Sequence, residues 1–367
     1  MRPDRLTRQQ LNRATLARQL LLERTDLSAP MAIEHLVGLQ SQAPQAHYVG
    51  LWSRLANFDP APVGAALESG ELVRTHAMRA TVHLFTRRDA FGLRSLMQPM
   101  LAARFQSSPF PKQLPGVDLR AVCREAHILA TQHAYSRVEL GHRLGAQFPG
   151  VPEDALAYAV TYLEPMVQLP PRGVWGKRSR VRWQTFRGWL GADADTPSNV
   201  DDVAMRYLAA FGPASASDMR TWSGLPGLRE VMERLAPQLR VFLDESGRQL
   251  LDLPEAPRPE PQVPAPVRFL PEYDNVLLSH DNRTRVIPDR RAVPLPPGQG
   301  ARIGTVLVEG IFRATWRIGG GAGGAALLHV QAEPPLSRQQ AREVEEEGSR
   351  LLGFVRPDSA GEVRINS

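Results

Sequence analysis

Apolar side chains recur at helical spacing near the start of the chain, and the pattern then changes to that of two short strands. Thr7 and Gln10 have the spacing of a capping box, and an apolar stripe follows them. Ser28 is placed to cap a second helix, and a third is predicted after Pro44. The segments ELVRTHAM and ATVHLFT are rich in β-branched residues and are predicted to pair as a hairpin. Three helices followed by a hairpin give the order of a winged helix.

The same order of elements is predicted twice more, after the proline-rich segment SSPFPKQLPG. Each further set has three helices and a hairpin. The helices are expected over 118–133, 136–147 and 153–165, and then over 200–212, 215–223 and 227–236. The hairpins are expected in PRGVWGKRSRVRWQTF and in LRVFLDESGRQLLDL. The sets share little sequence, so the predicted repeat is one of structure.

A second proline-rich stretch, PEAPRPEPQVPAPV, is predicted to be an extended connector because successive prolines fix φ and remove backbone donors. Three strand-rich segments follow it, VRFLPEYDNVLLSHDNRTRVIP, RIGTVLVEGIFRATWRIG and AALLHVQAE, and then one capped helix, SRQQAREVEEEGSRLLGFV. The sequence therefore predicts an α+β protein of three tandem winged-helix domains and a C-terminal β-rich lobe. The predicted domains cover 1–110, 117–195, 198–255 and 265–367.

Composition fits several globular units, since the chain has 367 residues, of which 43% are hydrophobic and 22% charged. The first thirty residues are charged throughout and no later stretch resembles a membrane span, so we expect a cytoplasmic protein without a membrane partner. The one cysteine, Cys123, excludes a disulfide framework and a cysteine zinc cluster. No HExxH, Gly-Lys-Ser/Thr loop or Gly-x-Ser-x-Gly elbow is present, so no metal and no cofactor are expected.

Five segments carry a resemblance to a known family: LNRATLARQLLLER, GLQSQAPQAHYVGLWSR, LVRTHAMRATVHLF, LPEYDNVLLSHDNRTRV and VLVEGIFRATWRI. Together they resemble the AlkZ and YcaQ group of winged-helix DNA glycosylases over nearly the whole chain. In that family a Gln-x-Gln or Gln-x-Asp pair serves the reaction, and Gln40 and Gln42 match it here. A glutamine at the third position, where YcaQ-like members have an acid, implies the AlkZ side. That side is linked to self-resistance against DNA-alkylating natural products and to bulky or crosslinked adducts.

Two amides suit this chemistry because a purine alkylated at N7 already carries positive charge and leaves without protonation. What remains is to hold a water beneath C1′ and to stabilise an oxocarbenium-like sugar, which carboxamide oxygens do through hydrogen bonds and dipoles. This interpretation restricts cleavage to cationic lesions. The alternative is that Gln40 and Gln42 only bond backbone in the LQSQAP turn.

Further candidates for contact with the lesion or the DNA lie on the predicted hairpin and near the glutamines. Thr81 and His83 alternate along one strand, Arg79 precedes them, and His47 follows the Gln-Ser-Gln segment. A histidine on a strand is more often structural than catalytic, so a structural role stays open for both histidines.

The strongest positive charge falls between residues 172 and 187, which contain six basic residues and no acid, with Trp175, Trp183 and Phe186 interleaved. Basic side chains neutralise phosphates and release counterions, so this predicted hairpin is a candidate for binding DNA. The candidates in the stretch are Lys177, Arg178, Arg180 and Arg182. A solvated hairpin without a partner is the alternative.

Two further motifs are ambiguous in the sequence. The run from Gly319 to Gly324 satisfies G-x-G-x-x-G, but a strand follows it where a dinucleotide site needs a helix, so we predict a hairpin loop. The acids and arginines between Glu272 and Arg285 are either a polar network near DNA or a structural ion-paired cluster.

Two classes of function fit the sequence. The first is a monofunctional DNA glycosylase that acts, as a monomer without a protein partner, on double-stranded DNA with alkylated purines. The second is a non-enzymatic winged-helix protein: a regulator, a drug-sequestering protein, or a scaffold that binds DNA ends or crosslinks. The Gln-Ser-Gln segment favours the enzyme because a repressor does not require it.

Overall fold

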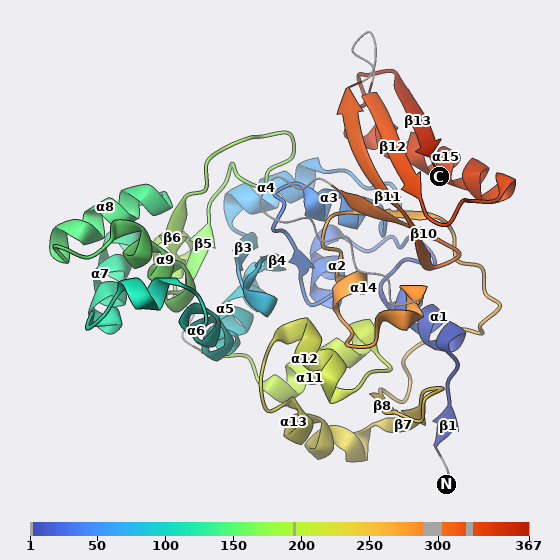
Figure 1. Cartoon of the computed structure of the whole chain (residues 1–367), viewed down its shortest axis with the longest axis horizontal. Coiled ribbons are helices and arrows are strands. Elements are labelled where there is room, and N and C mark those ends of the chain that lie inside the picture. The colour runs from blue at the N-terminus through green and yellow to red at the C-terminus, as the bar shows by residue number, and fades with distance from the viewer. Residues whose placement is uncertain (1–2, 194–195, 289–302, 321–325, 367) are drawn as a thin grey trace.

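The computed structural model describes residues 3–193, 196–288, 303–320 and 326–366, and it has the predicted α+β class (Figure 1). The strands form three sheets in the described residues, with orders β1-β7-β8, β2-β4-β3-β5-β6 and β13-β12-β11-β10-β9. The third sheet and α15 form the lobe at the C-terminal end of the chain, and the sheet of β1, β7 and β8 lies near the N-terminus (Figure 1).

The first predicted helices and hairpin are confirmed. Thr7 and Gln10 form the capping box of the first helix, and the Ser28 side chain accepts from Met31 N at the start of the second. A fourth helix, which the sequence did not indicate, precedes the hairpin. The elements are α1 (Arg8–Arg18), α2 (Ala29–His35), β2 (Leu39–Gln40), α3 (Ala46–Trp52), α4 (Ala61–Ser69), β3 (Leu72–His76), η1 (Met78–Ala80) and β4 (Val82–Thr86).

The second set of helices is also confirmed, but its strands are shorter than predicted. Instead of a hairpin that extends through the basic stretch, residues 169–182 form an irregular connection between two three-residue strands. These strands join β3 and so complete one sheet shared with the first set. The elements are α5 (Arg87–Leu96), α6 (Gln98–Gln106), η2 (Phe110–Gln113), α7 (Leu119–Gln132), α8 (Arg137–Gln147), α9 (Glu153–Leu163), β5 (Met166–Gln168), β6 (Trp183–Thr185) and α10 (Phe186–Leu190).

The third set has the predicted helices and a hairpin that turns through Gly247, whose φ of 84° favours glycine. The start of the chain adds a short parallel strand to this hairpin, so the third set packs directly against the N-terminal residues. The elements are β1 (Asp4–Arg5), α11 (Val200–Phe211), α12 (Ala216–Ser223), α13 (Leu228–Leu235), η3 (Ala236–Gln238), β7 (Arg240–Leu243) and β8 (Gln249–Asp252).

The C-terminal part is less strand-rich than predicted. Only three residues of the segment VRFLPEYDNVLLSHDNRTRVIP form a strand, because Asp274 and Asn282 each cap a short helical turn. The run of glycines from Gly319 to Gly324 lies largely outside the described residues. The elements are β9 (Arg268–Leu270), α14 (Asn275–Leu278), η4 (Arg283–Arg285), β10 (Gly304–Val308), β11 (Ile311–Gly320), β12 (Ala326–Ala332), α15 (Arg338–Val355) and β13 (Gly361–Asn366).

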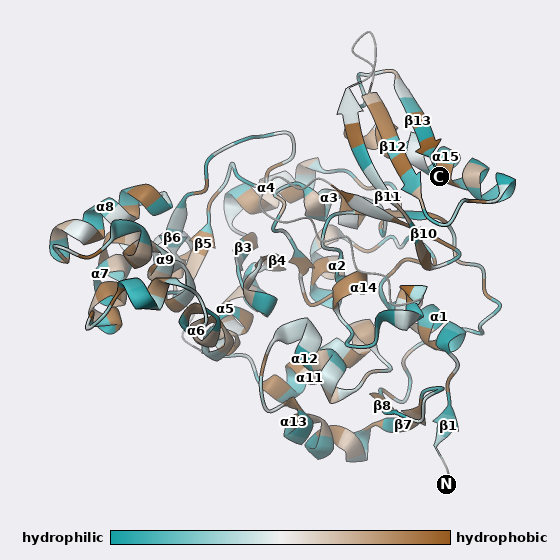
Figure 2. Cartoon of the chain, in the orientation of Figure 1, coloured by the Kyte–Doolittle hydropathy of each residue, from teal (hydrophilic) through white to brown (hydrophobic). Residues whose placement is uncertain are grey.

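The hydrophobic cores cross the predicted domain boundaries. Val73 and Phe85 of the first hairpin share one cluster with Tyr207 and Trp222 of the third set. Outer helices such as α13 show hydrophobic and hydrophilic residues side by side, as expected where one face is buried (Figure 2). The bounds of the four predicted domains stay a prediction. No helix among the described ranges is long and apolar enough to span a membrane.

A buried ion pair connects the first helix to the third set. Both nitrogens at the end of Arg18 reach Asp252, at 2.6 and 2.8 Å, and both side chains are 0% exposed. Arg258 of the connector reaches the same carboxylate at 2.5 Å. Removing one partner leaves a buried charge without compensation, which costs far more than the pair contributes.

We therefore predict that Asp252→Asn lowers the free energy of unfolding by about 3–5 kcal/mol, because the buried Arg18 and the half-buried Arg258 lose their carboxylate. Asp4→Asn is the matched control, since Asp4 pairs with Arg240 at 3.2 Å in an exposed position. The control substitution should lower the free energy of unfolding by less than about 1 kcal/mol. Urea unfolding of both variants measures the difference, and equal losses would contradict a structural role for the buried pair.

Candidate active site at the Gln-Ser-Gln segment

The two glutamines lie where strand β2 ends beside the hairpin. Gln40 is the last residue of β2 and pairs with His83 of β4 in antiparallel register. The pairing continues one step further, because Ser41 N donates to Val82 O at 2.8 Å. Gln42 follows outside the strand and is exposed, whereas Gln40 is only 6% exposed. The segment thus presents one glutamine at the surface and one just beneath it.

Neighbouring donors determine the orientation of both side-chain amides. Arg79 Nη2 donates to Gln40 Oε1 at 2.6 Å, and Val82 N donates to Gln42 Oε1 at 2.9 Å. A guanidinium and a backbone N–H are donors only, so each must face an amide oxygen rather than an amide nitrogen. A carbonyl oxygen has two lone pairs, so each glutamine oxygen keeps one acceptor position for a further ligand.

Arg79 reaches Gln40 from an unusual backbone conformation. Arg79 and Ala80 have φ values of 54° and 58°, in the left-handed region that side chains rarely adopt. The guanidinium also donates to the carbonyl of Trp222 at 2.5 Å, which joins the η1 turn to α12. Burial, with a smaller effect of the Arg283 charge, lowers the pKa of Arg79 to about 10. Arg79 therefore stays charged at neutral pH beside the Gln40 amide.

Ser41 anchors the Gln-Ser-Gln segment through its hydroxyl and carbonyl groups. Its hydroxyl accepts from Arg74 Nε at 3.0 Å and lies 2.8 Å from His47 Nδ1, and its carbonyl accepts from Arg74 Nη2 at 2.7 Å. Burial and then the charge of Arg74 hold the pKa of His47 well below its usual value. This buried network fixes the backbone between the two glutamines, so it positions both side chains.

The structure places the predicted histidines inside the protein. The candidate contacts His83 and His47 are 0% and 1% exposed, which favours the structural role that the sequence left open for both. Burial, then the Arg79 charge, lowers the pKa of His83 to about 3, so its ring is neutral at physiological pH. Its Nδ1 lies 3.0 Å from Thr81 O and therefore carries the proton, which leaves Nε2, 3.5 Å from Arg79 Nη2, as an acceptor. Thr81 is half-buried and donates from Oγ1 to Met78 O.

The basic stretch divides into paired and unpaired residues. Lys177 lies 2.7 Å from Glu68, and Arg182 bonds to the carbonyl of Ala134 and lies 3.7 Å from Glu139. Arg178 and Arg180 are exposed and form no ion pair or side-chain hydrogen bond within the described part of the chain. These two arginines are the side chains of the stretch that are free to bind phosphate.

The basic loop is attached to the Gln-Ser-Gln segment. Gln45 Nε2 donates to Val174 O at 3.0 Å, and Gln45 Oε1 accepts from Gly176 N at 3.2 Å. Trp175 packs against Tyr48, with ring centroids 4.8 Å apart, so this aromatic residue is structural. Trp183 and Phe186 are buried as well. The loop is therefore hydrogen-bonded to the segment that follows the two glutamines.

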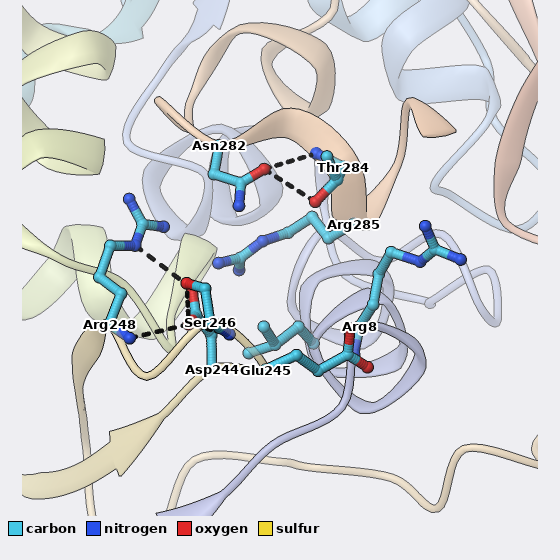
Figure 3. A pocket seen from close by; sticks show the side chains of 9 residues that line it. Arg8, Asp244, Glu245, Ser246, Arg248, Asn282, Thr284 and Arg285 are labelled. Atoms are coloured by element: carbon cyan, nitrogen blue, oxygen red, sulfur yellow. Dashed lines mark hydrogen bonds and ion pairs between the residues drawn. The ribbon is translucent and has the colours of Figure 1, made fainter. Parts of the chain in front are cut away.

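The acids and arginines between Glu272 and Arg285 are largely structural. Asp274 and Arg54 form a buried pair at 2.8 Å, and the buried Arg285 donates to Thr15 Oγ1 at 3.1 Å. Arg285 also lines a polar pocket of about 130 Å³ between α1, the β7–β8 turn and η4 (Figure 3). Where the structure describes the chain, no three His, Cys, Asp or Glu side chains gather as metal ligands.

Sequence reasoning missed two residues that hold the site. Arg74 is the one charged residue in the apolar strand LVRTH, and its charge at a buried strand position was the available indication of a structural role. Asn275 donates to Gly38 O at 2.9 Å, just before β2. No spacing in the sequence indicates this contact, which joins residues more than 200 positions apart.

Comparison with known proteins identifies the family of the chain. The sequence model of the AlkZ-like DNA glycosylases matches residues 33–354. An interstrand DNA cross-link repair glycosylase of Streptomyces sahachiroi is 27% identical over 302 residues, which are 76% of this chain and 79% of that protein. The solved structure of the S. sahachiroi DNA glycosylase AlkZ superposes with a TM-score of 0.76 and 22% identity, over 99% of this chain and 100% of the other. The chain belongs to the AlkZ-like DNA glycosylase family.

Proposed function

We propose that this protein is a monofunctional DNA glycosylase that hydrolyses the N-glycosidic bond of cationic N7-alkylated purines in duplex DNA. The observation that carries the proposal is the pair of glutamines whose amide oxygens are oriented by Arg79 and Val82. Oriented amides need no reorganisation when positive charge develops on the sugar. The absence of a carboxylate from the Gln-Ser-Gln segment fits a reaction that needs no strong base.

The mechanism divides the work between the two side chains. The exposed Gln42 accepts a hydrogen bond from the attacking water through the second lone pair of Oε1 and holds this water beneath C1′. Gln40, held by Arg79, directs its amide dipole toward the oxocarbenium-like sugar. The alkylated base leaves as a neutral molecule because it already carried the positive charge, so no general acid is required, and the proton that the attacking water loses passes to solvent.

The lesions we propose are bulky natural-product adducts or interstrand crosslinks. The S. sahachiroi relative bears the name of an interstrand cross-link repair glycosylase, which supports this class and a role in repair or self-resistance. A bulky base does not fit a tight pocket, and the exposed position of Gln42 suits an open cleft that reaches C1′ with little or no base flipping.

We further propose that the three helical sets are winged-helix domains that surround the duplex, and that the protein acts as a monomer in the cytoplasm. The hydrogen bonds of Gln45 to Val174 and Gly176, which join the basic loop to the segment after the glutamines, support a shared DNA-binding face. A phosphate held by Arg178 or Arg180 then sets the distance of the sugar from the glutamines.

Single substitutions of the glutamines test the reaction. Gln40→Ala and Gln42→Ala should each slow the release of 7-methylguanine from methylated duplex DNA by roughly a hundredfold, because an oriented dipole or the water-binding oxygen is lost. Gln339→Ala is the control, since Gln339 bonds Glu343 on the exposed face of α15. Release by both variants at the parental rate would contradict the proposed roles. If the protein only bound DNA and were not an enzyme, the parent protein itself would release no base.

The excision rate should not depend on pH between 6 and 8. His83 has a pKa of about 3 and stays neutral down to pH 6, while Arg79 and Arg74, at about 10 and 9, stay charged up to pH 8. No group around the two glutamines therefore changes charge, and single-turnover rates should vary by less than about twofold. A rate that falls along a titration curve centred near pH 6.5 would show that a histidine takes part.

Charge reversal tests the basic loop. The double variant Arg178→Glu, Arg180→Glu should bind any duplex at least roughly tenfold more weakly, and the slope of log K against log salt should decrease by about 1 for each lost phosphate contact. Arg229→Glu on α13 is the control, because Arg229 is exposed but pairs with Glu233 on its own helix. Equal affinity of the double variant and the parent would remove the loop from the interface.

A further inference from the structure

A group of aromatic rings joins the C-terminal helix to the basic loop, residues 169–182. Phe354, near the end of α15, has its ring centroid 5.0 Å from that of Trp175 in the loop, at an interplanar angle of 26°. The same ring lies 5.9 Å from Trp52 of α3 and 5.8 Å from Phe58, which follows this helix. Phe354 therefore contacts three segments of the chain, and the basic loop is one of them.

An ion pair holds α15 against the same region, which gives Phe354 a fixed place. Glu347 of α15 is 1% exposed and accepts from Arg24 Nη2 at 2.6 Å. The guanidinium of Arg24 also lies over the ring of Trp52, 4.6 Å from its centroid, and Arg24 Nε donates to Trp52 O at 3.0 Å. The spacing of Glu347 and Phe354 is about two helical turns, so both side chains leave the same face of α15.

Packing between side chains holds the ring of Trp175 in its position. Gly173 and Gly176, with φ values of 90° and 70°, stand close to it on both sides, and glycine restricts the backbone less than any other residue. Trp175 N donates to the hydroxyl of Tyr48 at 2.9 Å, and the two ring centroids are 4.8 Å apart. The indole is thus held by two rings, Tyr48 from the first set and Phe354 from the C-terminal lobe.

The two free arginines of the loop, Arg178 and Arg180, follow Trp175 closely in the chain. The loop extends from β5 and β6 to α4, where Lys177 lies 2.7 Å from Glu68 (Figure 1). This ion pair is exposed, so water screens it and it contributes little to the position of the loop. A movement of the Trp175 ring therefore also moves the backbone that carries both arginines.

We propose that Phe354 is a positioning residue, which holds the basic loop in the conformation in which Arg178 and Arg180 bind duplex DNA. This inference rests on the proposed function, because that function assigns the two arginines to phosphates. A loop that is ordered before binding loses less conformational entropy when its side chains meet the DNA. The C-terminal lobe thus sets the affinity for DNA through a residue that contributes no charge.

Hydrogen exchange of the free protein measures the order of the loop directly. The backbone amides of residues 174–177 each donate a hydrogen bond. In Phe354→Ala these amides should exchange at least roughly tenfold faster than in the parent, because the packing that closes the loop is lost. Phe110→Ala is the matched control, since Phe110 is a half-buried ring that stacks on Tyr158, with centroids 3.7 Å apart, in the second set. The control should leave exchange in the loop unchanged.

A double-mutant cycle connects the order of the loop to DNA binding. Phe354→Ala should bind duplex DNA roughly fivefold to tenfold more weakly than the parent, because two arginine side chains must then be ordered during binding. In the background Arg178→Gln, Arg180→Gln the same substitution should change the affinity by less than about twofold, since no arginine of the loop is left to position. The slope of log K against log salt should be equal in Phe354→Ala and the parent, because every phosphate contact keeps its charge.

Conservative variants separate this result from misfolding. Phe354→Tyr keeps the ring and should match the parent, while Phe354→Leu fills most of the space without a ring and should show intermediate losses; it replaces Phe354→Ala if that variant does not fold. Unchanged exchange at residues 174–177, or an equal loss of affinity with and without the two arginines, would overturn the inference. These assays measure exchange and binding alone, so a protein that shows the predicted pattern but releases no 7-methylguanine would contradict only the proposed function.

Discussion

Buried guanidinium groups hold the parts of this chain together, and the site depends on them. Arg18, Arg54, Arg74 and Arg94 are among the largest side chains that are completely enclosed. Arg54 and Arg18 find carboxylates far along the chain, Asp274 and Asp252, whereas Arg74 donates to the backbone and hydroxyl of Ser41. Because a planar guanidinium donates in several fixed directions, one arginine joins segments that no continuous strand or helix connects.

The hydrogen bonds around Ser41 make the geometry of the site depend on one of these buried arginines, Arg74. Arg74 holds Ser41 and also donates to the carbonyl of Arg172 at 3.4 Å, at the start of the basic loop. One side chain thus fixes the backbone between the two glutamines and the loop that we propose binds DNA. Gly173, with a φ of 90°, leaves room for it, since a Cβ there would lie 2.7 Å from Arg74 Cδ. The position of the glutamines relative to the loop therefore depends on close packing around a single cation.

Local features of the fold were predictable from the sequence, while the contacts between distant segments were not. Thr7 and Ser28 cap helices as their spacing indicates, and the hairpin after residue 71 follows from its β-branched residues. The basic stretch was wrongly predicted as a hairpin because Trp175 packs on Tyr48 instead of alternating along a strand. The helical turns after residue 270 were missed because each is only three or four residues long.

In the candidate site, too, the contacts between distant segments could not be predicted from the sequence. The pair Gln40 and Gln42 could be identified from a family resemblance, and the basic residues from composition. The burial of His83 and His47 could not be predicted, since a position in a strand or a helix does not show which other elements cover that residue. The partners of Arg79 come from three separate elements, so only the folded chain shows that this arginine pairs with no carboxylate among the described residues.

In the proposed reaction two neutral amides suffice because the leaving base is already cationic. The most direct measurement compares single-turnover release of 7-methylguanine and of uracil from duplexes of the same sequence. The account predicts release of the cationic base and none of the neutral base above the uncatalysed rate. Release of uracil at a comparable rate would contradict it, because a neutral base requires an acid that this site does not contain.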